Sequence, residues 1–203
     1  MKKLLLKNKE LSLTIKLISA LSAALLFFAV AYGQELSDKT EITGEELVVE
    51  KGGDVIISRG NSKAVSGDYV LTSREMRFNR KTNEVSAKGA VKLKSKTENN
   101  EPITATGKNA LYNTQTGEGK FWGDVEIVTS SGTIFSDKAQ VDAKTKSMTV
   151  SSETKRPVAD TVYDNRKGLF EADTMTYYHS EDNKKIVMKG SVKGKIEMED
   201  KIK

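Results

Sequence analysis

The chain has 203 residues, of which 37% are hydrophobic and 30% are charged, and it contains no cysteine and one histidine. The absence of cysteine excludes a disulfide framework and a thiolate metal site. The formal net charge of +5 comes mostly from residues 1–33, because the rest of the chain carries 28 basic and 27 acidic residues, a net charge of +1. With both signs mixed along the chain, there is no basic stripe of the kind that binds nucleic acid.

Residues 1–33 have the layout of an export signal. Lys2 and Lys3 open a basic segment, Leu17–Ala31 is uncharged and apolar, and small residues follow. This order is typical of a secretory signal peptide. The apolar run of about 15 residues is shorter than the roughly 20 that a membrane-spanning helix needs. Cleavage is therefore expected, with an uncleaved anchor as the alternative, and both interpretations place the rest of the chain outside the cytoplasm.

The remainder is predicted to be a flexible lead (34–41), one domain (42–198) and a short tail (199–203). Within the domain a two-strand sequence motif recurs about every 30 to 35 residues. It consists of an apolar strand, a polar turn, and a second strand that often ends at Gly-x-Val. A period of this length is typical of stacked structural repeats. The predicted turns, which are rich in the residues that favour tight reversals, are 50–54, 79–83, 113–117, 142–146 and 179–183.

Alternation of apolar and polar residues predicts strands with one buried face. Phe121–Ile127 is an example, since Phe, Gly, Val and Ile occupy its odd positions. A single hairpin cannot bury its own apolar face, but several can by stacking. The pattern predicts an all-β fold of repeated antiparallel hairpins, either a β-solenoid or two antiparallel sheets that face each other in a jelly-roll-like sandwich. Lys94–Pro102 is expected to be a surface loop, and residues 151–168 are expected to be a long loop insertion.

The interior residues follow from the same alternation. Small residues alternate with large flexible ones on this face, and methionines adapt to irregular or greasy ligands as well as filling plain cores. The pattern leaves both an ordinary dry core and a lipid groove open. The lipid-groove candidates are Met76, Phe78, Val91, Ala110, Tyr112, Phe121, Val125, Ile127, Phe135, Val141, Met148, Met175, Tyr177, Ile186, Met188 and Val192.

No catalytic, metal or cofactor site is predicted. His179 falls in a predicted turn, without a nucleophile motif beside it. The acidic residues are scattered singly, which does not suit a metal site. Gly117–Lys120 lacks the remaining residues of a phosphate-binding loop and is interpreted as a hairpin turn. Trp122 is expected to face away from Phe121, either as a lone surface aromatic residue or packed under the charged loop.

The recurring units resemble the OstA-like family, whose periplasmic members LptA and LptC belong to the lipopolysaccharide transport system. The resemblance spans about residues 42–198. Two departures are the insertion at 151–168 and the lack of a strict Gly-Asn-Val triplet. The segments that carry the resemblance are Ala110–Asn113 with Gly123–Ile127, Ile134–Asp142, and Phe170–Tyr177 with Gly190–Val192.

The resemblance implies a twisted open β-jelly roll, built from repeated antiparallel hairpins, whose interior holds the lipid A acyl chains of lipopolysaccharide. It also implies a non-enzymatic periplasmic carrier. Family members join end to end by β-strand addition, which implies homo-oligomers and pairing with other OstA-like domains in a bridge from inner to outer membrane. The expected edges are residues 46–49 or 55–58 at one end and 184–196 at the other. The LptA-like soluble form, the LptC-like anchored form and a structural β-solenoid with a dry core remain alternatives.

Overall fold

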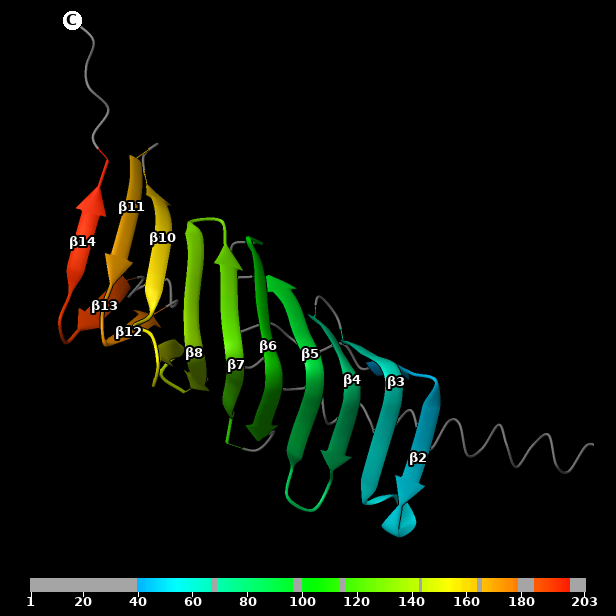
Figure 1. The fold of residues 1–203 in the computed structure, drawn as a ribbon. Coiled ribbons are helices and arrows are strands. Elements are labelled where there is room, and N and C mark those ends of the chain that lie inside the picture. The colour runs from blue at the N-terminus through cyan, green and yellow to red at the C-terminus, as the bar shows by residue number, and fades with distance from the viewer. Residues whose placement is uncertain are drawn as a thin grey trace, which may run out of the picture.

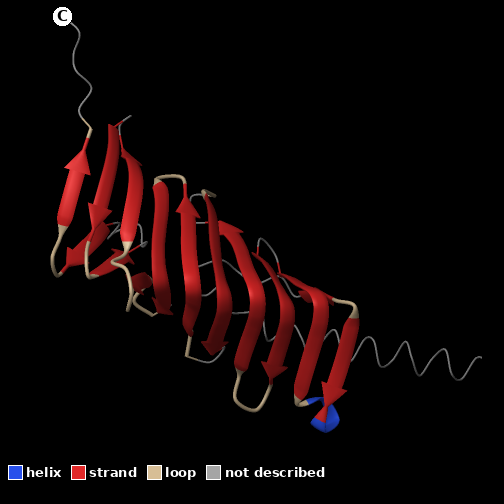
Figure 2. Ribbon diagram, in the orientation of Figure 1, coloured by secondary structure: helices blue, strands red, loops and turns tan. Residues whose placement is uncertain are grey.

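The computed structural model describes residues 40–66, 69–96, 100–113, 116–142, 144–163, 166–178 and 185–197. These residues form one antiparallel sheet of fourteen strands and a single 3-10 turn, η1 (Lys51–Gly53) (Figures 1 and 2). The expected all-β open jelly roll is therefore confirmed. The export signal, His179 with its turn, and the tail lie outside the described residues. The strands are β1 (Thr40–Thr43), β2 (Glu46–Glu50), β3 (Val55–Ser66), β4 (Tyr69–Asn79), β5 (Glu84–Lys96), β6 (Pro102–Asn113), β7 (Glu118–Thr129), β8 (Gly132–Asp142), β9 (Ser147–Ser151), β10 (Val158–Tyr163), β11 (Arg166–Glu171), β12 (Thr174–Tyr178), β13 (Lys185–Lys189) and β14 (Lys193–Ile196).

The long strands β3 to β8 each contribute to two layers. One half of each strand belongs to a first layer, which begins at β2 and continues through β9 and β12 to β13. The other half belongs to a second layer, which begins at β1 and continues through β10 and β11 to β14. Figure 1 shows β2 at one end of the molecule and β14 at the other. The sheet is therefore folded lengthwise and stays open at both ends.

A row of β-bulges forms the corner between the two layers. Two consecutive residues with positive φ mark the corner in three strands, at Gly60-Asn61, Gly89-Ala90 and Gly123-Asp124. Glycine adopts this backbone at little steric cost, and a bulge bends the strand without ending it. The prediction that Gly-x-Val closes a strand was wrong in β5 and β7, where the triplet is a corner inside a continuous strand. The register shifts of the row are Arg59/Ser62, Thr72/Glu75, Lys88/Val91, Thr106/Asn109 and Trp122/Val125.

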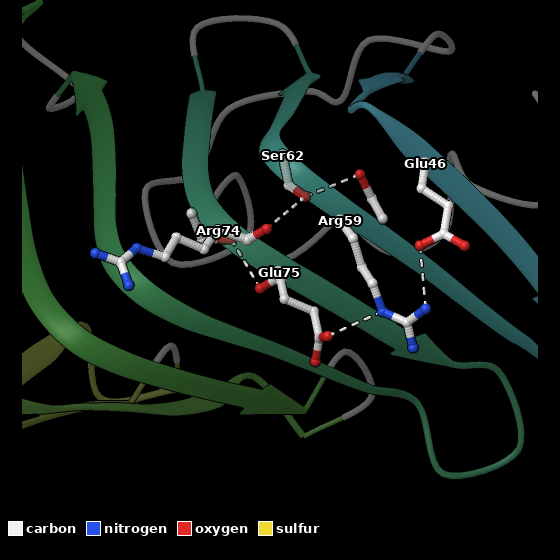
Figure 3. Close-up of polar contacts among 7 residues, drawn as sticks. Glu46, Arg59, Ser62, Arg74 and Glu75 are labelled. Atoms are coloured by element: carbon white, nitrogen blue, oxygen red, sulfur yellow. Dashed lines mark hydrogen bonds and ion pairs between the residues drawn. The ribbon is translucent and has the colours of Figure 1, made fainter.

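Serine hydroxyls satisfy carbonyl groups that the bulges release from the ladder. Ser62 Oγ donates a hydrogen bond to the carbonyl of Arg74 at 3.4 Å (Figure 3), and Ser73 Oγ donates to the carbonyl of Glu75 at 2.8 Å. Both serines are buried, with exposed fractions of 0% and 6%. A buried carbonyl without a partner would cost free energy, so these small polar residues stabilise the corner beneath an otherwise apolar interior.

The segment 151–168 is not a loop insertion, so that prediction was wrong. Val158–Tyr163 forms β10 and pairs with β11 and with the first half of β8. The connection before it, residues 152–157, crosses from the first layer to the second and is held by Asp137. The Asp137 carboxylate accepts the backbone N–H groups of Glu153 and Thr154, both at 3.1 Å. Similarly, the expected loop at 94–102 contains the end of β5 and the start of β6.

Replacing Gly132 with alanine is expected to destabilise the fold by about 2–4 kcal/mol. A Cβ atom at this position would lie 2.1 Å from the carbonyl oxygen of Asp160, and φ is +145°. The obstacle is the backbone of β10, which cannot rotate away as a side chain can. Urea unfolding measures the change. Gly52→Ala is the matched control, because φ is +67° there and nothing lies within 4 Å of the added Cβ; equal losses in the two variants would contradict close approach of β8 and β10.

Candidate functional site

The structure places most of the predicted groove residues in the interior between the layers. Tyr177 and Met188 are half-buried, and Ile186 is 39% exposed although its side chain lies in the same inward row as Tyr177 and Met148. Burial confirms the facing of these side chains, while their contact with lipid remains a prediction. The fully buried members are Met76, Phe78, Val91, Ala110, Tyr112, Phe121, Val125, Ile127, Val141, Met148 and Met175.

Phe135 faces outward, so its predicted placement was wrong. Its side chain is 46% exposed, opposite Glu126 of β7 and Val158 of β10. The cause is a change of facing within β8, where Ser136 and Ala139 are both buried although three positions separate them. At this point along the chain, β8 stops pairing with β10 and begins to pair with β9. Strict alternation across a bulge therefore assigned the wrong face.

Val192 also lies outside the interior, with 48% of its side chain exposed. The preceding Gly190 has φ of +89°, and the chain there crosses from β13 to β14 instead of continuing as a strand. Asp173 holds this crossing, because its carboxylate accepts the backbone N–H of Ser191 at 3.1 Å and pairs with Arg156 at 3.2 Å. The third Gly-x-Val copy is thus a connection between layers.

Two apolar cavities of about 50 Å³ each lie between the layers. The N-terminal cavity is lined by Phe78, Tyr112 and Phe121 together with Ile56 and Leu71, which sequence analysis missed. The C-terminal cavity is lined by residues that include Ile103, Ile127, Ile134, Met148, Met175 and Tyr177. Alternation does not single out Ile56, because Val55, Ile56, Ile57 and Ser58 are all buried.

The apolar interior reaches both open ends of the sheet. At the first end, Leu47 and Val49 of β2 are 49% and 44% exposed, although they lie opposite the buried Ser58 and Ile56. At the other end, Ile196 of β14 is 57% exposed and lies opposite the buried Gly168. These side chains face inward, and within the described residues no further strand covers them. The interior is therefore a trough with two apolar mouths.

The two ends carry opposite charges. At the first end, β1 contains Glu41 and β2 is bounded by Glu46 and Glu50. At the other end, β13 is bounded by Lys185 and Lys189, and β14 contains Lys193 and Lys195. Among the described residues each of these strands pairs on one side only, and the free side of such an edge can accept another strand. The expected edge in residues 55–58 was wrong, because this part of β3 pairs with β2 on one side and with β4 on the other.

The first end is also braced by ion pairs on its outer face. Arg59 lies between Glu46 and Glu75, with nitrogen–oxygen distances of 3.1 and 3.2 Å (Figure 3). Hydrogen bonds to Glu46 and Glu75 raise the pKa of Arg59 above its ordinary value. The bridge links β2 to β4 across β3 and fixes the position of the edge strand.

Two carboxyl groups that accept hydrogen bonds from neighbouring connections also have shifted pKa values. Hydrogen bonds from Thr154 hold the pKa of the Asp137 carboxyl below its ordinary value. Burial raises the pKa of Asp142, but hydrogen bonds from Thr145 and Lys144 outweigh this effect and leave it lowered. Among the residues that the structure describes, no three His, Cys, Asp or Glu side chains gather as metal ligands. In the same part of the chain, no apolar helix reaches membrane-spanning length.

Comparison with known proteins gives two matches. Residues 36–120 match a family described as "LptA/(LptD N-terminal domain) LPS transport protein". Among solved structures, the fold resembles the crystal structure of LptH from Pseudomonas aeruginosa, described as the LptA homologous periplasmic component of the lipopolysaccharide transport device. That likeness has a TM-score of 0.53 and 15% identity and covers 62% of this chain and 94% of the other. It establishes the fold. No curated protein matches the chain.

Proposed function

We propose that this chain, whose residues 36–120 match the LptA/LptD N-terminal family of lipopolysaccharide transport proteins, is a non-enzymatic periplasmic carrier of lipopolysaccharide. In this proposal the trough shields the acyl chains from water, and copies or related domains join end to end into a bridge between the inner and outer membranes. The observation that carries the proposal is the continuous apolar interior with a mouth at each end.

An acyl chain needs such a trough because its exposure to water is unfavourable. Each methylene group of an acyl chain that leaves water gains about 0.8 kcal/mol, so a carrier must offer apolar surface over the whole path. The cavities of about 50 Å³ are smaller than an acyl chain. The chains therefore enter as the layers separate along the rims opposite the bulge corner. The small volume of the cavities also supports a second candidate function, that of a structural protein whose core holds no lipid.

The two ends of the first layer match each other residue by residue. Placing β13 of one copy antiparallel to β2 of the next brings Lys189 and Lys185 opposite Glu46 and Glu50 on the outer face. The central Val187 then lies opposite Val48. On the inner face, the same register joins apolar residues only, pairing Met188 with Leu47 and Ile186 with Val49. Opposite charges and apolar pairs across strands are favourable, and the trough continues through the joint.

Strand direction supports the same joint. Within the described residues each layer contains ten strand segments, from β2 to β13 and from β1 to β14, and every neighbouring pair is antiparallel. Because the number of strand segments in each layer is even, the last segment runs antiparallel to the first. A second copy can therefore be added at either layer without a parallel pair, which would break the hydrogen-bond pattern.

Photo-crosslinking tests the carrier. A benzophenone side chain at Phe121, which lines the N-terminal cavity, is expected to capture lipopolysaccharide in cells, because its ring occupies the place of the native aromatic side chain. The matched control is Lys88, an exposed residue on the outer face of the same layer. Adducts are measured by immunoblotting against the lipid.

Capture at Lys88 but not at Phe121 would contradict the trough, and an absence of adducts at Tyr112 and Met148 as well would favour the dry core. The mass of the mature protein separates the two forms of the carrier. Loss of residues 1–33 is expected for the soluble LptA-like form, and their retention would indicate the anchored LptC-like form.

A further inference from the structure

A polar groove lies directly outside the N-terminal cavity, on the first layer. It has a volume of about 580 Å³, and its polar lining includes Glu84, Glu118, Lys120, Gln140 and Asp142. A second hollow of about 460 Å³ adjoins it, because both are lined by Lys120 and Gln140. Trp122, Lys138 and Ser151 complete that second hollow. We call the two hollows together the outer shelf.

The outer shelf and the apolar cavity share one wall. Leu111, Tyr112, Gly119 and Val141 line both the cavity and the polar groove. Tyr112 lies flat over Gly119, where an added Cβ would come within 2.2 Å of the ring. Glycine at this position leaves only backbone between the ring and the outside. A molecule with an apolar tail and a polar head can therefore place the tail under Tyr112 and the head on the shelf, across the rim of one layer.

The chemistry of the shelf favours hydroxyl groups over an anion. Three carboxylates, Glu84, Glu118 and Asp142, outnumber the single ammonium of Lys120 in the larger hollow, so a phosphate there would meet net negative charge. In the described part of the chain, the side chains of Glu118 and Gln140 make no hydrogen bond, and both are exposed. A carboxylate accepts and an amide both donates and accepts, which suits a neutral sugar ring.

The aromatic residue of the shelf lies within reach of the same head group. Trp122 is two positions from Lys120 on β7, a separation of roughly 7 Å in a strand, and the Lys120 ammonium lies 5.6 Å from the centre of its ring. A sugar ring can displace the Lys120 side chain and pack against the Trp122 indole, because an aromatic ring offers a large, rigid and amphipathic contact surface.

We propose that the outer shelf is a carbohydrate subsite, which holds a neutral sugar of the bound amphiphile while its acyl chain occupies the cavity behind Tyr112. The inference rests on the proposed function, since it assumes that an acyl chain enters the trough. It adds a head-group preference that the apolar interior alone does not provide.

Two detergents with the same tail and different heads test the proposal. Dodecyl maltoside carries a neutral disaccharide and dodecyl phosphate carries an anion, and both are titrated below their micelle concentrations by calorimetry. The maltoside is expected to bind about tenfold more tightly. Trp122 is the only tryptophan of the chain, so its fluorescence reports occupation of the shelf directly. A shift is expected with the maltoside and not with the phosphate.

Variants complete the test. Gln140→Ala and Glu118→Ala are expected to remove the tenfold preference and leave the affinity for dodecyl phosphate unchanged. Lys92→Ala, an exposed change away from the shelf, is expected to change neither affinity. Equal affinities for the two detergents, with a silent Trp122, would overturn the carbohydrate subsite and leave the acyl-chain carrier standing. If neither detergent binds, both proposals fail.

Discussion

Replacing Val125 with aspartate is expected to abolish cooperative folding. Val125 is 2% exposed and lies on the inner face of β7, one residue past the bulge corner. An unpaired carboxylate there would lose its hydration without gaining a partner, a cost of about 4 kcal/mol or more. This is a large part of the 5–15 kcal/mol that holds a typical domain together. Circular dichroism during urea unfolding would show the loss of the transition.

Two controls separate the charge from its position. Val125→Ala removes the same side chain without adding charge and is expected to cost about 2 kcal/mol. Glu126→Lys reverses a charge on the outer face next to it, and a surface change of this kind is expected to stay within about 0.5 kcal/mol. If Val125→Asp is as stable as Val125→Ala, water reaches the resting trough, and the two layers are already apart before lipid enters.

Alternation and turn chemistry were sufficient to predict the fold because most strands have one face in the trough and one in solvent. Met76 and Phe78, or Val125 and Ile127, are two positions apart and are buried together. Turn predictions succeeded where a side chain closes the reversal, as when Asn79 Oδ1 accepts the backbone N–H of Lys81 at 3.0 Å. These signals are local and can be read without knowing which strands pair.

The errors at Phe135, Val192 and residues 151–168 share a different cause. Each depends on where a strand changes its partner, and that is decided by residues distant in sequence. Phe135 turns outward because β8 changes partner from β10 to β9 just after it. Gly190 ends a strand, whereas Gly89 and Gly123 bend one. The triplet is the same in all three places, and only the neighbouring strands distinguish a corner from a crossing.

The acidic and basic ends explain how one molecule can have two exposed edges without aggregating at random. Pairing of two β2 edges would place Glu46 and Glu50 of one copy against the same residues of another, and pairing of two β13 edges would oppose lysines. Like charges directly opposite each other in a ladder are unfavourable. In the proposed bridge, charge would therefore select the partner edge, and the apolar residues between the charges would supply the affinity.

Reversing the charge of the two β13 lysines is expected to stop end-to-end association. Mixing this variant with one in which the charges of β2 are reversed is expected to restore it. In the double variant Lys185→Glu and Lys189→Glu, two attractive contacts with Glu50 and Glu46 become repulsive. This change costs about 2 kcal/mol and weakens association roughly thirtyfold. The opposite double variant, Glu46→Lys and Glu50→Lys, is expected to be equally monomeric by sedimentation velocity at matched concentration.

Mixing the two double variants recreates an opposite-charge joint at every contact, because the acidic β13 of one meets the basic β2 of the other, and the unmodified edges also face opposite charge. Alternating oligomers are therefore expected to form only in the mixture. Salt should weaken them, since exposed pairs are screened at an ionic strength of about 0.15 M. If the mixture stays monomeric while the unmodified protein associates, the joint does not use the β13–β2 register. If each variant associates alone as well as the unmodified chain does, charge does not choose the partner edge.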